Sequence, residues 1–135
     1  MKKIILSTLV CLAFGYAASA QTQKDTTIVF DKLVHDFGNI VQSAGPQTCK
    51  FEFTNTGTEP IIIQQVQPSC GCTAPNWTKE PIAPGEKGEI LATYNPGGAM
   101  PFDKILTVRS NGNPSSIVLH IKGVVVTATQ PEPTK

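Results

Sequence analysis

Two cysteines separated by one glycine, Cys70 and Cys72, are the residues whose types and spacing point most directly to chemistry. A third cysteine, Cys49, lies about 20 residues earlier, in a segment where it alternates with Phe51 and Phe53. Thiols can form disulfides, exchange disulfides with a partner, bind soft metal ions such as Cu(I) or Zn(II), or pack as small apolar groups. The spacing leaves all four interpretations open.

Two of these interpretations involve a disulfide. A structural bridge from Cys49 to Cys70 or Cys72 would close a loop of about 20 residues and stabilise the fold by about 3 kcal/mol. It leaves one thiol unpaired, because the fourth cysteine, Cys11, lies in the expected leader described below and the other three cannot all pair within one chain. A bridge between Cys70 and Cys72 fits an extended backbone poorly, although Gly71 allows the chain to turn. Such a bond is easily reduced, which is typical of redox-active disulfides.

The other two interpretations keep the thiols free. Cys70 and Cys72 are candidate ligands for a soft metal ion, but a closed zinc site takes four ligands, and only Cys49 or a histidine could complete the set. Alternatively, the thiols are partly buried and only pack. We favour the two structural interpretations, a bridge to Cys49 or packed thiols, and we expect no cofactor.

The two histidines provide no convincing partner for a catalytic thiol. His35 precedes Asp36, so a Cys–His–Asp set can be drawn, but nucleophilic catalysis needs the base within about 3 Å of the sulfur. His120 falls on the polar side of an alternating segment and is expected at the surface. The carboxylates form no acid–base pair. We therefore expect no enzymatic activity and assign no catalytic residue.

The first 20 residues have the pattern of a secretion signal. A basic start precedes a mostly apolar run, Ile4 to Phe14, and small residues at Ala18 and Ala20 place the cleavage between Ala20 and Gln21. The run is too short to cross a bilayer, which needs about 20 apolar residues. We expect an exported protein, in the periplasm or the extracellular medium, that does not insert into a membrane after processing.

The charge of the processed chain argues against nucleic acid as a partner. Without Lys2 and Lys3, nine basic residues face ten acidic ones, so the net charge is near −1. No basic patch remains to bind phosphates. The remaining chain of about 115 residues is long enough for one domain. We expect a monomer whose partner is a protein or another component of the cell envelope.

Short apolar runs interrupted about every ten residues by glycine, proline and asparagine indicate an all-β domain over residues 27–126. We expect an immunoglobulin-like antiparallel β-sandwich of seven or eight strands, flanked by flexible segments at 21–26 and 127–135. The expected strands are 27–30, 35–40, 49–54, 61–63, 73–77, 89–94, 102–110 and 117–122. Asn55 to Thr58 is expected to join 49–54 and 61–63 as a hairpin, and Trp77 is expected to pack in the core.

Several of these segments together resemble a bacterial family known as domain of unknown function 1573. The matching pieces are His35-Asp36-Phe37-Gly38, Phe51 to Gly57, Ser69 to Thr73, Pro84-Gly85-Glu86 and Ser110-Asn111. The resemblance implies an immunoglobulin-like sandwich on an exported protein, similar to periplasmic chaperone and cilium-associated domains. It implies no activity, and Cys49 does not match the family pattern.

Two classes of function follow. The first is a non-enzymatic binding or structural module that acts through a sheet edge or through the loops at one end of the sandwich, as this architecture commonly does. The alternative is a thiol-dependent role, in metal handling or redox exchange, at Cys70 and Cys72.

Overall fold

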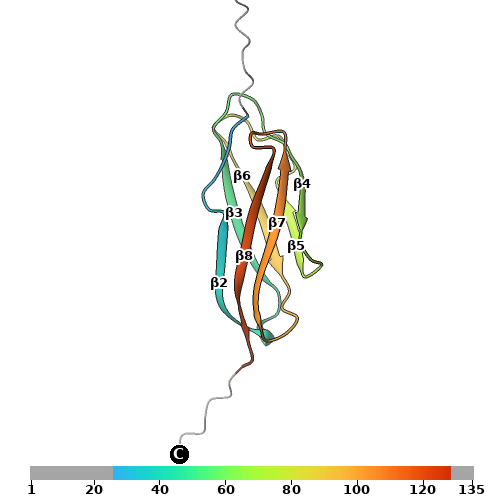
Figure 1. The fold of residues 1–135 in the computed structure, drawn as a ribbon. Helices are drawn as coiled ribbons and strands as arrows, with labels where there is room; N and C mark the ends of the chain where they lie inside the picture. Colours follow the sequence, from blue (N-terminus) through green and yellow to red (C-terminus); the bar gives the residue numbers. More distant parts are fainter. Residues whose placement is uncertain (1–25, 129–135) are drawn as a thin grey trace, which may run out of the picture.

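The computed structural model describes residues 26–128 as two packed β-sheets (Figure 1). The expectation of an all-β, immunoglobulin-like sandwich with seven or eight strands is confirmed. Within the described residues, helical structure is a single 3-10 turn, η1 (Gln42–Ala44), and no helix could cross a membrane. The strands are β1 (Ile28–Phe30), β2 (Val34–Val41), β3 (Gln47–Asn55), β4 (Ile63–Pro68), β5 (Thr73–Trp77), β6 (Lys87–Tyr94), β7 (Pro101–Ser110) and β8 (Ser116–Val126).

One sheet has the strand order β1-β3-β6-β5 and the other β2-β8-β7-β4. The pairs are antiparallel except that β2 runs parallel to β8, which departs from the expected wholly antiparallel arrangement. The exception arises because the chain changes sheets between β1 and β2. After pairing with β3, it bends at residues 31–33 and continues as the edge strand of the facing sheet.

The core lies between the sheets and follows the alternation seen in the sequence. Phe51 and Phe53 of β3 are fully buried, as are Leu119 and Ile121 of β8 in the facing sheet. Gly88 of β6 stands opposite Phe53, and a Cβ there would overlap the Phe53 ring, so the absence of a side chain makes room for it. The alternate side chains of the strands therefore build one continuous core.

The expected hairpin between the third and fourth strands is wrong, because β3 and β4 belong to different sheets. The buried side chain of Asn55 holds the connection in place. Its amide nitrogen donates to the carbonyls of Glu59 and Ile82 at 2.8 and 2.9 Å, and its side-chain oxygen accepts from Gly57 N–H at 3.0 Å. These bonds fix a loop that crosses from one sheet to the other, which a two-residue hairpin turn cannot do.

Two glycines adopt positive φ angles, one in a turn and one at an irregularity in β2. Gly85, in the expected Pro84-Gly85-Glu86 turn, has φ +81°, and Gly38 has φ +64° where β2 shifts register against β8. Other residues rarely adopt such angles. The predicted signal peptide (1–20) lies outside the described residues, as do most of the segments predicted to be flexible, 21–26 and 127–135.

Candidate functional site

The two long edges of the sandwich differ. β4 and β5 are the edge strands on one side and lie against each other; we call this the closed edge. There Trp77 of β5 packs against the core, and its indole N–H donates to the Ile63 carbonyl of β4 at 3.2 Å. The expected core role of Trp77 agrees with this position. On the other side, β1 and β2 form what we call the open edge.

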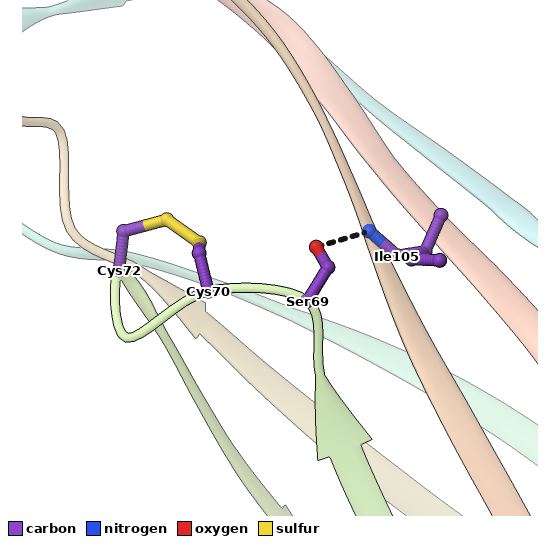
Figure 2. The surroundings of a disulfide bond; sticks show 4 residues. All are labelled: Ser69, Cys70, Cys72 and Ile105. Carbon is purple, nitrogen blue, oxygen red and sulfur yellow. Dashed lines mark hydrogen bonds between the residues drawn. A yellow bond between two sulfur atoms is a disulfide. The ribbon is translucent and has the colours of Figure 1, made fainter.

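The turn between β4 and β5 contains Cys70 and Cys72 at the closed edge (Figure 2). Ser69 fastens the turn to β7, because its N–H donates to the Ile105 carbonyl at 2.9 Å and its hydroxyl accepts from Ile105 N–H at 3.2 Å. The Cys72 carbonyl accepts from Asn95 N–H at 2.8 Å, beyond the end of β6. The turn is thus held to both sheets.

Cys70 and Cys72 form a disulfide with each other, with their Cα atoms 5.3 Å apart, and Cys49 is a free thiol. Both favoured interpretations, a bridge to Cys49 and free, packed thiols at Cys70 and Cys72, are therefore wrong, and the bridge that forms is the one between Cys70 and Cys72. Cys49 pairs with Ala92 on one side of β6, whereas Thr73, next to Cys72, pairs with Tyr94 on the other side. Strands two apart in a sheet are separated by about 9.5 Å, more than the roughly 7 Å that a disulfide spans.

The Cys49 thiol is shielded from solvent. Its residue is 4% exposed, and burial raises the pKa of this thiol to about 11, with a small opposing effect from the charge on Lys32. A thiol with so high a pKa carries almost no thiolate at neutral pH and is a poor nucleophile. By contrast, the two disulfide cysteines are half-buried, and Gly71 between them is exposed.

The histidines lie apart from the disulfide. His35 belongs to β2, and the disulfide turn follows β4, so they lie at opposite edges of the same sheet. The His35 imidazole contacts Lys32 Nζ at 2.9 Å, and burial, followed by the Lys32 charge, lowers its pKa. His120 lies 3.2 Å from Asp103 and its side chain is 42% exposed. No Cys–His–Asp set is assembled from these residues.

The open edge carries a groove that the sequence analysis missed. The groove has a volume of about 470 Å³ and is lined by β1, Leu33, Pro114 and the first three residues of β8. Apolar side chains around it are exposed, among them Val29, Leu33 and Val118. The sequence held part of a signal for it, because Val29 and Val118 are apolar residues at outward positions of strands whose inward positions are already apolar.

Most motifs that suggested the family resemblance hold loops and turns of the sandwich in place. Asn55 organises the loop after β3, and Gly85 supplies a turn angle. Asn111 joins two loops, since its side chain accepts from Ile62 N–H at 2.7 Å and donates to the Pro60 carbonyl at 3.1 Å. The motif that contains the disulfide is the one with chemically reactive atoms.

Comparison with solved structures shows the same fold at low sequence identity. A protein of unknown function from Porphyromonas gingivalis W83 matches with a TM-score of 0.68 and 12% identity, over 82% of this chain and 51% of that protein. The PapD-like domain 7 of human CEP192 matches with a TM-score of 0.63 and 11% identity, over 95% of this chain and 100% of that domain. The chaperone YadV matches with a TM-score of 0.50 and 12% identity, over 78% of this chain and 54% of the chaperone.

The chain thus spans about half the length of the Porphyromonas protein. No curated protein matches this sequence. A family profile does match, over residues 28–125, which include all strands of the sandwich except the last residue of β8. The chain belongs to the family described as protein of unknown function (DUF1573).

Proposed function

We propose that this protein is a non-enzymatic binding module that recognises another protein through its open edge, and that it acts after export to the periplasm or the extracellular medium. The observation that carries the proposal is the uncovered apolar groove between β1 and the start of β8. Sandwich domains commonly recognise partners through their loops or sheet edges, and this analogy of fold supports the proposal.

The composition of the groove favours a protein partner. Its lining is apolar apart from the Ser116 hydroxyl and carries no charged side chain. Contiguous exposed apolar surface is uncommon on small soluble domains and marks sites of interaction. Phosphates and other small anions have nothing here to pair with, whereas apolar side chains of a protein would be removed from water.

Site-specific photo-crosslinking in the native host tests the proposal. A photoreactive amino acid at Val118, which is 42% exposed in the groove, is expected to trap a discrete envelope protein. Val124 is the matched control, because it lies on the same strand with 37% exposure but away from the groove. A V118K variant should abolish the adduct formed from a second probe at Val29, and V124K should retain it. Equal adducts from Val118 and Val124, or none from either, would contradict the proposal.

A second candidate function is thiol–disulfide exchange, and the Cys70–Cys72 disulfide favours it. In this exchange a thiolate of a partner attacks one sulfur of the Cys70–Cys72 disulfide, which forms a mixed disulfide and releases the other cysteine. The second thiol of the partner then attacks the partner's own sulfur in the mixed disulfide and releases the first cysteine. The partner dithiol is oxidised to a disulfide while Cys70 and Cys72 are reduced to thiols. Metal binding would require this reduction first, because soft ions bind thiolates rather than a disulfide.

The reduction potential of the disulfide separates the two candidates. Equilibration of the purified protein with glutathione or dithiothreitol buffers, read by mass spectrometry after alkylation, gives its value. A potential above about −270 mV would support exchange, because the redox-active disulfides of thiol–disulfide oxidoreductases lie between about −270 and −120 mV. A potential below about −300 mV marks a structural disulfide and would remove the second candidate.

A further inference from the structure

We infer that Lys104 activates the Cys70–Cys72 disulfide for exchange, because its ammonium group stabilises the thiolate that the reaction releases at Cys70. The inference rests on the second candidate function, thiol–disulfide exchange with a partner dithiol. It adds to that function the charge that favours the reaction and the cysteine on which the charge acts.

Strand β7 places Lys104 beside the disulfide turn. The two hydrogen bonds between Ser69 and Ile105 continue the ladder of β4 and β7 by one residue beyond the last paired residue of β4. Since the two strands run in opposite directions, the next residue of β7, Lys104, lies beside the next residue of the turn, Cys70. Figure 2 shows the disulfide directly after Ser69, where the turn leaves β7.

The Lys104 side chain leaves β7 on the side of the core. Lys104 pairs with Ile121 of β8, which is fully buried, and residues paired directly across two strands have their side chains on the same face. Cys72 also packs against the core, and Lys104 is half-buried. Because β4 ends before this point, the disulfide turn is the segment that follows β4 along β7 at the closed edge.

Lys104 has no counter-charge while the disulfide is formed. Its ammonium group has neither an ion pair nor a hydrogen bond within residues 26–128. The segments around it, 63–77 and 90–100, contain no charged residue. The adjacent carboxylate, Asp103, lies on the outer face of β7, where it contacts His120 at 3.2 Å. A half-buried cation without a partner is unfavourable, so a negative charge at this position would be stabilised.

The facing sheet adds no charge to the turn. Tyr94 of β6 pairs with Thr73, which follows Cys72 in the chain. Burial raises the pKa of the Tyr94 phenol, so this group is uncharged at neutral pH. The electrostatics of the turn therefore depend on Lys104.

Exchange would supply the missing negative charge. Each of its two steps breaks one bond to sulfur and releases one cysteine as a thiolate. A cation within about 6 Å of a thiol favours the thiolate and lowers its pKa, and a thiol of lower pKa leaves faster. Lys104 would thus accelerate the step that releases Cys70. It would also favour the reduced pair, so that the site oxidises a partner dithiol.

The pH dependence of alkylation tests this role. The variants C72S and C70S each leave one thiol in the turn, which avoids the coupled titration of two neighbouring thiols. Reaction with iodoacetamide over a range of pH, read for each cysteine by mass spectrometry, gives the pKa of that thiol. In C72S, addition of K104Q should raise the pKa of Cys70 by about one unit and lower its thiolate fraction at neutral pH by up to about tenfold. K104R retains the charge and should retain the low pKa.

K122Q is the matched control, because Lys122 pairs with Asp103 on the outer face of the same sheet. It should leave the pKa of Cys70 unchanged. The same pKa with and without Lys104, an equal shift from K122Q, or a larger shift from K104Q at Cys72 than at Cys70 would overturn the inference.

The reduction potential of the unmodified protein keeps this result separate from the exchange function. If the potential lies in the range of thiol–disulfide oxidoreductases while K104Q has no effect, exchange stands and Lys104 does not activate it. If the potential lies in the range of structural disulfides, exchange and the role of Lys104 fail together. Photo-crosslinking at Val118 tests the binding function independently of both.

Discussion

Each long edge of this sandwich brings together one edge strand from each sheet, but the two edges differ in how their strands are connected and covered. At the closed edge, β4 and β5 are joined by a short turn. Trp77 of β5 bonds to β4 in the other sheet, and Ser69 bonds the turn to β7. At the open edge, β1 and β2 are joined by only three residues, and the switch between sheets leaves β8 partly unpaired. Side chains and a disulfide cover the closed edge. At the open edge, the first residues of β8 are not paired with β2, and apolar side chains are exposed.

This difference separates stability from binding. Residues of the closed edge contact the core and both sheets, so changes there should lower the free energy of unfolding. At the open edge Ile28 belongs to the core, but the outward side chains Val29 and Val118 are exposed, so changes at these two residues should leave folding nearly unaffected and affect recognition. The experiments below test that division, beginning with the largest expected effect.

Trp77→Ala should produce the largest loss. It removes packing against the core and the hydrogen bond to the Ile63 carbonyl, and the expected loss is about 3 kcal/mol in the free energy of unfolding. Trp77→Phe retains part of the packing and should lose clearly less. Urea denaturation followed by far-ultraviolet circular dichroism measures both. A loss below about 1 kcal/mol for the alanine variant would mean that the closed edge is not held by this residue.

The buried thiol should make stability fall at alkaline pH. The pKa of Cys49 is raised to about 11 in the folded state, above its usual value of 9.0, so the unfolded chain loses its proton first as the pH rises. The contribution of this thiol is complete below pH 9, declines between pH 9 and about 11, and amounts to about 2 kcal/mol. Denaturation curves at several pH values should show this decline, and Cys49→Ala should lack that part of it. An identical pH dependence in both proteins would show that Cys49 titrates normally.

Loss of the disulfide should be milder than loss of Trp77. Closure of a loop of only three residues restricts the unfolded chain little, and the chain-entropy estimate is about 1.5 kcal/mol. A double variant, C70S/C72S, should therefore remain folded, with a midpoint of denaturation reduced by about that amount. A variant that fails to fold would show that the disulfide contributes far more to stability than closure of this short loop predicts.

Removal of one buried hydroxyl should stabilise the closed edge slightly. Thr73 is 3% exposed, and its hydroxyl oxygen has no hydrogen-bond partner within residues 26–128. Thr73→Val keeps the shape and removes the unsatisfied polar group, so the free energy of unfolding should rise by up to about 1 kcal/mol. Thermal denaturation measures the change, with Thr73→Ser as the control that retains the hydroxyl. A loss of stability in the valine variant would indicate that the hydroxyl is hydrogen-bonded in solution.

V118K and V124K should have the smallest effects on folding. Both residues lie on the outer side of β8 and are partly exposed, so the free energy of unfolding should change by less than about 0.5 kcal/mol. Only V118K should reduce partner capture. A large loss of stability in V118K would place Val118 among the residues that hold the fold.

The strands could be predicted from the sequence because their alternation is local. Cys49, Phe51 and Phe53 are one face of β3 and are buried, as their spacing indicated. Which strands become neighbours is decided by residues far apart in the chain, and so the hairpin expected after Asn55 was wrong. The pairing of Cys49 with Cys70 or Cys72 failed for the same reason, since β6 lies between them. The outward apolar residues Val29 and Val118 are visible in the sequence, but the groove that brings them together depends on where the chain switches sheets, which no local pattern reveals.

The most direct measurement of the central claim is the amide exchange of two neighbouring residues in the free protein. Leu119 N–H faces β7 in the ladder, whereas Val118 N–H faces the groove. In the absence of any partner, Val118 should exchange at least about a hundredfold faster than Leu119, because only the latter must await opening of the sheet. Equal protection of the two amides would show that the edge of β8 is already covered, and the open edge would lose its role as a binding site.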